Sequence, residues 1–201
     1  MEMPSDERPV CDRGQARPCE GASSGFGRHF ALFLAGRGAR VTVAARRAEA
    51  IDKTVQTTHA DKGQAQGVVM DVTSTGSIDV ALAAAEQGFG PVDVLINNAG
   101  VASTKAALEQ AEADWDKVID TNLKGVWLCS HSVGRRMAEL KTVGSIVNIA
   151  SILGLRVAGA VAPYAVSKAG VVQMTKALAL EWAPSWHTRQ CAGTGLFRDG
   201  A

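Results

Sequence analysis

The apolar residues of this chain follow two alternating patterns. Longer segments with helical spacing separate four short runs that are rich in β-branched residues, at 39–45 (ARVTVAA), 65–70 (AQGVVM), 92–100 (VDVLINNAG) and 144–151 (GSIVNIAS). The runs are apolar at successive positions, which is typical of parallel strands covered by helices on both faces. The pattern predicts an α/β fold with a doubly wound parallel sheet.

The alternation spans residues 21–183 and predicts one domain there. The two ends, 1–20 and 184–201, contain Pro, Cys and Arg without any period, and we expect both to be irregular. Three large side chains inside the domain stand at helical spacings that predict packing in the core rather than chemistry: Trp115, Trp127 and Met137.

Composition and charge narrow the classes of function. The formal net charge is +1 and the basic residues are dispersed, so the sequence favours neither a nucleic-acid partner nor a membrane anchor. Apolar runs are too short to span a membrane, and the polar start MEMPSDERPV lacks the apolar centre of a signal peptide, so we expect a cytoplasmic protein. The four cysteines form no CxxC pair and the four histidines are scattered, which predicts no metal site.

A glycine-rich turn precedes the first helical pattern. In GASSGFG (21–27), Gly21, Gly25 and Gly27 stand directly before the segment RHFALFLAGRG. Such glycines let the backbone approach a pyrophosphate, and the N-terminus of the following helix attracts its negative charge. The turn predicts a nucleotide site; the alternative is a plain turn of the same composition.

The end of the next predicted strand bears on the choice of nucleotide. In dinucleotide-binding folds an acidic residue here hydrogen-bonds the ribose 2′-hydroxyl, whereas arginine accommodates a 2′-phosphate. This chain has no acid at this place, where the residues are Ala44, Ala45, Arg46 and Arg47. They favour NADP over NAD, and the alternative is that the arginines only begin a solvated helix.

The only tyrosine of the chain, Tyr164, has a lysine four positions later, Lys168. Positions i and i+4 share a helix face, so both side chains can reach one pocket. A free phenol titrates at a pH of about 10, and a nearby ammonium group favours its ionised form, which suits it to proton transfer. Ser151, at the end of a predicted strand, would stabilise charge on the same reacting oxygen. The ordinary alternatives are a packed ring beside a solvated charge, and a helix cap.

Several motifs occur in the order typical of the short-chain dehydrogenase/reductase family: GASSGFG, MDVT, NNAG, TNLKG, VNIAS and YAVSK. Over residues 21–183 the chain resembles that family. The resemblance implies a Rossmann-type NAD(P)-binding catalytic domain. It also implies hydride transfer between NADP(H) and a small-molecule secondary alcohol or carbonyl, and a homo-oligomer.

The resemblance also implies roles for single residues. The family's catalytic tetrad corresponds to Asn122, Ser151, Tyr164 and Lys168. Tyr164 would exchange a proton with the substrate oxygen, Lys168 would also hold the nicotinamide ribose, and Asn122 would hold a water that links the lysine to solvent. Asp71 would hydrogen-bond the adenine amino group. Tyr164 and Lys168 would also contact the cofactor, together with Gly21, Ser23, Ser24, Gly25, Phe26, Gly27, Arg46, Val72, Asn98, Ala99 and Gly100.

Both ends of the chain depart from the family. Members begin with an apolar strand leading to Thr-Gly, where this chain has CDRGQARPCEG, and members continue after the helix at ALALEWA with a strand and a Pro-Gly turn. We therefore expect a sheet that lacks its first and its last strands.

One hypothesis explains both departures. Permitted codons from Ala183 onward, read with one base removed, give Ala-Arg-His-Gly-Ile-Arg-Val-Asn-Ala-Leu-Ala-Pro-Gly, which is the missing strand and turn. A similar shift restores an apolar first strand. The two ends would then be frame-shifted, and the alternative is chance helped by codon degeneracy.

Two functions remain open on the sequence. The first is the NADP-dependent oxidoreductase. The alternative is a non-catalytic remnant or nucleotide-binding module of the same family, because loss of the terminal strands would damage the phosphate turn and the nicotinamide contacts. The substrate is not specified, since ILGLRVAGAVA (152–162) indicates only an apolar wall beside Ser151.

Overall fold

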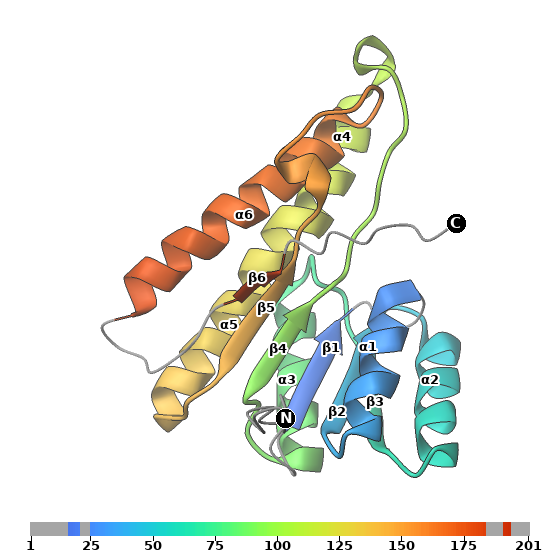
Figure 1. Ribbon diagram of the computed structural model, residues 1–201, viewed down its shortest axis with the longest axis vertical. Helices are drawn as coiled ribbons and strands as arrows, with labels where there is room; N and C mark the ends of the chain where they lie inside the picture. Colours follow the sequence, from blue (N-terminus) through green and yellow to red (C-terminus); the bar gives the residue numbers. More distant parts are fainter. Residues whose placement is uncertain (1–15, 21–24, 184–190, 194–201) are drawn as a thin grey trace, which may run out of the picture.

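The computed structural model describes residues 16–20, 25–183 and 191–193. These form one sheet of six parallel strands in the order β3-β2-β1-β4-β5-β6 (Figure 1). The strands are β1 (Ala16–Glu20), β2 (Arg40–Ala45), β3 (Gln64–Val69), β4 (Val94–Asn97), β5 (Ser145–Ile149) and β6 (Cys191–Gly193). The predicted doubly wound parallel sheet is confirmed.

Helices alternate with the strands along the chain. They are α1 (Gly25–Gly36), α2 (Ala48–Ala60), α3 (Thr75–Phe89), α4 (Glu112–Ile119), α5 (Gly125–Leu140) and α6 (Ala162–Trp182). Short turns of helix lie at η1 (Ala107–Glu109), η2 (Asp120–Lys124) and η3 (Ile152–Gly154). Figure 1 shows α1 and α2 on one face of the sheet and α3 and α5 on the other. None of the described helices is both long and apolar enough to cross a membrane.

The continuous apolar runs are explained by burial on both faces of the sheet. Successive residues of a strand point to opposite faces. In β2, Val43 packs in the apolar cluster on the side of α1, whereas its neighbour Ala44 packs in the cluster that includes Ile78 of α3 and Val133 of α5. A strand covered on both faces therefore favours apolar residues at successive positions, and the few buried polar residues in these strands include Thr42, Asn97 and Asn148.

The expected absence of the first strand is not confirmed. β1 pairs in parallel with β2 from Ala16 to Glu20, and with β4 through Cys19 and Ile96. The expectation depended on side-chain preferences in this segment, whereas parallel pairing is made by the backbone and tolerates unusual side chains. β6 likewise extends the sheet beyond β5. The remaining parts of the predicted irregular ends, and most of the residues behind the frame-shift hypothesis, lie outside the described residues.

The prediction of core packing is right for Met137 and wrong for the two tryptophans. Met137 is 1% exposed, whereas Trp115 and Trp127 are 41% and 43% exposed. The helical period marks a face but does not say whether another element covers it. The ring of Trp127 instead stacks on that of His131 one turn later, with the ring centroids 5.3 Å apart.

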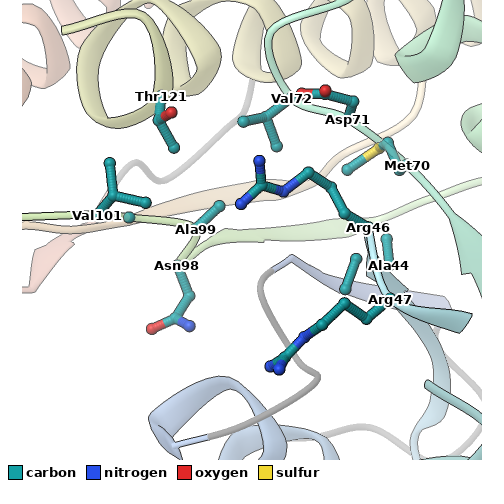
Figure 2. A pocket seen from close by; sticks show the side chains of 12 residues that line it. Ala44, Arg46, Arg47, Met70, Asp71, Val72, Asn98, Ala99, Val101 and Thr121 are labelled. Carbon is teal, nitrogen blue, oxygen red and sulfur yellow. The ribbon is translucent and has the colours of Figure 1, made fainter. Parts of the chain in front are cut away.

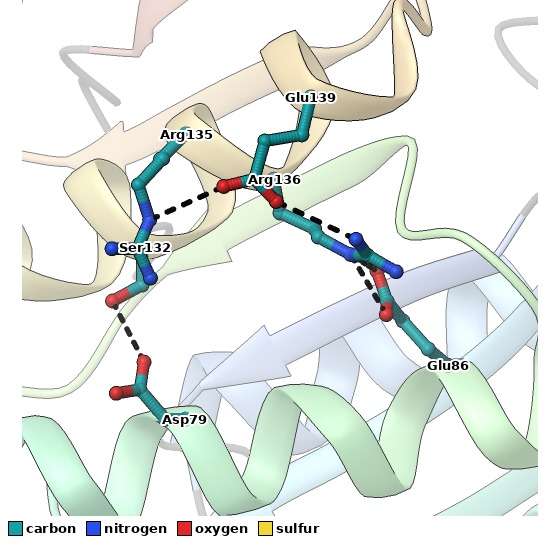
Figure 3. A network of polar contacts seen from close by, with 6 residues as sticks. All are labelled: Asp79, Glu86, Ser132, Arg135, Arg136 and Glu139. Atoms are coloured by element: carbon teal, nitrogen blue, oxygen red, sulfur yellow. Dashed lines mark hydrogen bonds and ion pairs between the residues drawn. The ribbon is translucent and has the colours of Figure 1, made fainter.

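Polar contacts join α3 and α5 on the outside of the sheet (Figure 3). Nε of Arg136 lies 3.0 Å from both carboxylate oxygens of Glu86, and the hydroxyl of Ser132 donates to Asp79 at 3.3 Å. These contacts hold α5 in place. This helix directly follows η2, the turn that contains Asn122.

The strand order reverses direction at β1. From β1 the sheet continues through β2 and β3 on one side and through β4, β5 and β6 on the other. The connections after β1 and β4 therefore leave on different sides, which opens a crevice at the carboxyl ends of the strands. This is the place where α/β proteins of this architecture bind ligands.

Candidate active site

Two cavities open at this edge of the sheet and share part of their lining. Their volumes are about 530 and about 570 Å³, and both are lined by Asn98, Gly100 and Val101, which directly follow β4. The two cavities are therefore adjacent and share one wall. We call them the arginine cavity and the tyrosine cavity, after Arg46 and Tyr164.

The arginine cavity begins at the end of β2. It is lined by Ala44, Ala45, Arg46, Arg47, Met70, Asp71, Val72, Asn98, Ala99, Gly100, Val101 and Thr121. Figure 2 shows the side chains of Arg46 and Arg47 leaving the end of β2 in different directions, with that of Arg46 extending among the other labelled side chains. Among these described residues Asp71 is the only carboxylate, and it follows β3 rather than β2. The end of β2 itself therefore presents positive charge without an acid.

The carboxylate of Asp71 is held by the residues that follow it. Its Oδ1 accepts hydrogen bonds from the backbone N–H of Thr73 at 2.9 Å and from the hydroxyl of Thr73 at 2.8 Å. These bonds, and after them the positive charge of Arg46, lower the pKa of Asp71 below its usual value. The backbone N–H of Asp71 donates to Ser77 in the first turn of α3. Asp71 is therefore ionised and fixed at neutral pH.

The tyrosine cavity brings together three of the predicted catalytic residues. Tyr164 and Lys168 reach it from α6, and Ser151 reaches it from the segment after β5. Pro163 at the start of α6 suits the first turn of a helix, where its missing N–H leaves no bond unmade. Phe26 and Phe30 of α1 also line this cavity.

Lys168 is buried, with 4% of its surface exposed, and its Nζ donates a 2.7 Å hydrogen bond to the backbone carbonyl of Ile149. Nζ also lies 5.8 Å from the centre of the Tyr164 ring. Burial lowers the pKa of Lys168 to about 8, because the ammonium group loses solvation. Near neutral pH the lysine still carries its positive charge. Because the site is buried, solvent screens this charge only weakly.

A glycine lets η3 approach this part of α6. A Cβ built on Gly154 would lie 2.8 Å from the backbone carbon and oxygen of Lys168, a distance that real contacts do not reach. Any larger residue would push η3 away from α6. Because Ser151 begins η3, this close approach also sets the distance between Ser151 and the helix that holds Tyr164.

Ser151 has extended backbone geometry and caps η3, since its Oγ accepts a 3.2 Å hydrogen bond from the N–H of Leu153. The interpretation as a cap is therefore correct, and it is compatible with a second role. A hydroxyl that accepts one bond still has its own hydrogen to donate. Ser151 lines the tyrosine cavity, where that hydrogen is available to a ligand.

Asn122 is fully buried in the π-helical turn η2 and lies behind the wall shared by the two cavities. Its side-chain amide pairs with both backbone groups of Val101, accepting from the N–H and donating to the carbonyl at 2.8 Å each. Its Nδ2 also lies 3.2 Å from the hydroxyl of Ser167, which donates to the carbonyl of Tyr164 at 2.7 Å. Asn122 thus ties the shared wall to the backbone of α6.

Most of the remaining predicted site residues that the structure describes line one cavity or the other. Arg46, Asp71, Val72 and Ala99 line the arginine cavity alone, and Phe26 lines the tyrosine cavity. Gly25 and Gly27 lie in the first turn of α1, where Gly25 has φ +57°, a value that favours glycine. Gly21, Ser23 and Ser24 lie outside the described residues.

Sequence reasoning missed several residues of the site. Phe30 and Val101 line the cavities although no motif includes them, and Thr121 lines the arginine cavity although only its neighbour Asn122 was predicted from the motif TNLKG. The spacing of four residues between Phe26 and Phe30 was the available signal for Phe30, because such pairs share a helix face.

The sequence analysis also did not predict a row of buried, hydrogen-bonded polar side chains behind the site. The amide nitrogen of Asn97 lies 3.0 Å from the hydroxyl of Ser130 and 2.8 Å from Oδ1 of Asn148, whose own amide donates to Thr175 at 2.9 Å. These hydrogen bonds link β4 and β5 to α5 and α6. Asn97 and Asn148 lie in separate apolar runs of the sequence, and nothing in either run indicates that the two side chains meet in the sheet.

The fold and this crevice are those of a dinucleotide-binding α/β protein. Comparison with known sequences identifies the particular family. The chain belongs to the short-chain dehydrogenase family, because the sequence profile described as "short chain dehydrogenase" matches residues 19–195.

Among curated proteins, the chain is similar to a (2S)-[(R)-hydroxy(phenyl)methyl]succinyl-CoA dehydrogenase subunit of Thauera aromatica. The two are 40% identical over 176 residues, which cover 88% of this chain and 70% of the relative. A 3-oxoacyl-[acyl-carrier-protein] reductase of Synechocystis is 38% identical, with 88% and 71% covered. A gluconate 5-dehydrogenase of Gluconobacter oxydans is 36% identical, with 81% and 63% covered. The chain therefore spans about two thirds of the length of these relatives.

Solved structures agree in fold. A short-chain type dehydrogenase/reductase from Mycobacterium marinum superposes with a TM-score of 0.84 at 32% identity, covering 90% of this chain and 72% of that one. A single-residue variant of the actinorhodin polyketide ketoreductase, solved with NADPH, superposes with a TM-score of 0.82 at 40% identity, covering 86% and 66%. The relatives' names include both reductases and dehydrogenases.

Proposed function

We propose that this chain is an NADP(H)-dependent oxidoreductase that interconverts a small carbonyl compound and its secondary alcohol. The observation that supports this most is that the two cavities are adjacent and share one wall. Tyr164, Lys168 and Ser151 line one of them, and the other presents Arg46 without an acid at the end of β2. A crevice of this kind can hold a dinucleotide with its reacting end beside the tyrosine.

The described residues fit an NADP(H) molecule. The conformation of Gly25 and the N-terminus of α1 suit a pyrophosphate, Asp71 suits the adenine amino group, and Arg46 suits a 2′-phosphate. Lys168 would hold the nicotinamide ribose. The solved NADPH complex of the related polyketide ketoreductase supports this choice of cofactor. When bound, the nicotinamide supplies or accepts the hydride.

The proton chemistry comes from the chain itself. In reduction, the phenol of Tyr164 gives its proton to the carbonyl oxygen, and in oxidation the phenolate takes it back. The ammonium group of Lys168, with its Nζ 5.8 Å from the centre of the Tyr164 ring, places positive charge beside the ring that carries this phenol. Ser151 donates its free hydrogen to the same oxygen and stabilises the charge that develops there.

The relatives guide the choice of substrates to test. Their names describe a hydroxy(phenyl)methyl acyl-CoA, 3-oxoacyl groups on a carrier protein, and gluconate. What these have in common is a carbonyl carbon or a carbon bearing a hydroxyl group. We therefore extend to this chain the interconversion of alcohol and carbonyl, rather than any one of the named substrates.

Two measurements test the proposal. The first titrates the 201-residue chain with NADPH and with NADH, following the change in nicotinamide fluorescence on binding. The second follows NADPH oxidation with aryl ketones, alkyl ketones, 3-oxoacyl thioesters and keto-sugar acids. We expect binding and turnover of at least one class. Binding without turnover of any class would instead support the nucleotide-binding module, and absence of binding would contradict both.

The proposal also includes a cytoplasmic location and self-association into a homo-oligomer. The exposed rings of Trp115 on α4 and Trp127 on α5 offer an apolar surface for a second copy. Light scattering after size exclusion measures the mass directly, and a monomer at all concentrations would remove self-association from the proposal. Fractionation of source cells tests the location.

A further inference from the structure

Helix α6 is tied to β5 by two polar contacts that start from neighbouring residues of the strand. Nζ of Lys168 donates to the backbone carbonyl of Ile149 at 2.7 Å, and Nδ2 of Asn148 donates to the hydroxyl of Thr175 at 2.9 Å. Lys168 and Thr175 stand about two helical turns apart, so they share one face of α6. The first contact holds the lysine itself, whereas the second holds the helix that carries it.

The contact of Thr175 is one end of a row of buried hydrogen bonds. Oδ1 of Asn148 accepts from Nδ2 of Asn97 at 2.8 Å, and the same nitrogen of Asn97 lies 3.0 Å from the hydroxyl of Ser130 on α5. At the other end, the hydroxyl of Thr175 donates to the carbonyl of Val171 at 2.7 Å. The four side chains of the row are at most 3% exposed, so water does not readily replace a partner that is removed.

Thr175 and Asn148 line neither the arginine cavity nor the tyrosine cavity, so a molecule bound in either cavity would not touch them. Ile149, the neighbour of Asn148, does line the tyrosine cavity, and Ser151 follows shortly after it. If β5 and α6 moved apart at the contact between Asn148 and Thr175, Nζ of Lys168 would lose the carbonyl of Ile149. The row therefore acts on the site through the lysine.

We infer that Thr175 is a positioning residue, which through Asn148 keeps α6 close enough to β5 for Lys168 to stay buried beside Tyr164. Its importance for turnover rests on the proposed function. Tyr164 is the only other titratable residue in the described lining of the tyrosine cavity, and it is burial that lowers the pKa of Lys168 to about 8. If α6 moves away from β5, water reaches the ammonium group, and the pKa of the lysine rises towards its ordinary value.

Thr175→Val tests the inference, because it keeps the branched shape of the side chain and leaves Nδ2 of Asn148 without its acceptor. The NMR signal of a ¹³C-labelled lysine Cε reports the charge of each lysine, and the signal missing from Lys168→Met identifies Lys168. We expect a midpoint near pH 8 in the unmodified chain and a rise of about half a pH unit or more in Thr175→Val. An unchanged midpoint in folded Thr175→Val would overturn the inference.

Two further variants separate positioning from general stability. Thr175→Ser keeps the hydroxyl and should keep the midpoint of the unmodified chain. Thr58→Val is the matched control, because Thr58 is 1% exposed on α2, lines neither cavity and donates to the carbonyl of Thr54 at 2.9 Å, much as Thr175 donates within α6. It should leave the Lys168 midpoint unchanged. A shift in Thr58→Val as large as that in Thr175→Val would argue against a specific role of Thr175.

Turnover provides a second measurement. With the best ketone of the panel, kcat should fall about tenfold in Thr175→Val, within the loss of up to about 10² that a 1 Å misplacement can cause, and Thr175→Ser should restore it. An unchanged kcat beside a shifted Lys168 midpoint would contradict the role of Thr175 in turnover. A shifted midpoint in a chain that turns over no ketone would contradict the proposed function and leave the positioning of Lys168 supported.

The unmodified chain provides the test if Thr175→Val does not fold. Coupling between two sites is reciprocal, so titration of Lys168 should also move the ¹⁵N signal of the Asn148 side-chain amide, with the same midpoint. The side-chain amide of Gln66, which donates to Thr42 and to the carbonyl of Ala85, lines neither cavity and should not follow that midpoint. An Asn148 signal that does not respond to Lys168 would refute the inference.

Discussion

Lys168 Nζ donates a 2.7 Å hydrogen bond to the backbone carbonyl of Ile149, the last residue of β5. The bond ties the helix that holds Tyr164 to the strand end that leads to Ser151. Tyr164 stands one turn before Lys168 on α6, and Ser151 stands two residues after Ile149. One buried lysine thus fixes the relative positions of the proposed proton donor and of the hydroxyl that acts on the same oxygen.

The buried lysine predicts a pH dependence of stability. Burial lowers the pKa of Lys168 from 10.5 to about 8, so between these values the unfolded chain binds more protons than the folded one. The free energy of unfolding should therefore rise from pH 8 towards pH 10.5, by up to about 3 kcal/mol from this group.

Urea unfolding near pH 8 and near pH 10 measures this rise, and Lys168→Met is the control because it removes the titrating group. The difference in unfolding free energy between the chain and this variant should change with pH in the direction given. Curves that stay parallel over the whole range would show that Lys168 is not buried as described.

The arginine at the end of β2 predicts cofactor preference. Arg46 lines the arginine cavity, and no acid stands at that strand end. Arg46→Ala should weaken NADPH binding about tenfold or more, the value of a hydrogen bond to a charged group, and should change NADH binding less than about twofold. Arg135→Ala is the control, since Arg135 pairs with Glu139 on α5 and lines neither cavity. Equal affinity of the unmodified chain for NADPH and NADH would refute the preference.

The buried asparagine predicts a structural defect. Asn122→Ala would leave both backbone groups of Val101 without their 2.8 Å partners. An unsatisfied buried group costs about 1–3 kcal/mol, and Val101 is only half-buried, so unfolding by urea should show a loss of about 1–3 kcal/mol in total. Ser167→Ala removes the 3.2 Å contact to Asn122 and the bond to the carbonyl of Tyr164, but it leaves both partners of Val101 in place and should cost less. A variant Asn122→Ala as stable as the unmodified chain would mean that water replaces the amide without loss.

The sequence predicts the sheet because burial on two faces favours continuous apolar runs. It predicts most of the site because the motif residues stand just after a strand, as Ser151 does, or one helical turn apart, as Tyr164 and Lys168 do. The structure has a strand at each of the four predicted runs, with β3 beginning one residue before its run, and Ser151, Tyr164 and Lys168 line one cavity. Contacts between distant segments could not be predicted in this way. The pairing of Asn97 with Asn148 joins residues 51 positions apart, and only the register of β4 against β5 brings them together.

The strand β1 shows a different limit. Its residues, ARPCE, are poor strand formers by side chain, yet its backbone pairs with β2 over five positions.

The frame-shift hypothesis remains a prediction, and sequencing of the coding DNA tests it. We expect corrected reads to change the frame near both ends and to restore an apolar first strand and a Pro-Gly turn. Clean reads that keep both present frames would reject the hypothesis.

The central claim is that the phenol of Tyr164 transfers the proton, and Tyr164→Phe tests it most directly because it keeps the ring and removes only the hydroxyl. The measurement is kcat for NADPH oxidation with the best ketone of the panel, together with NADPH affinity and the thermal melting midpoint. We predict a loss of about 10²–10⁴ in kcat, with NADPH binding and melting almost unchanged. Near-normal turnover in Tyr164→Phe would contradict the claim and leave Tyr164 as a packed ring.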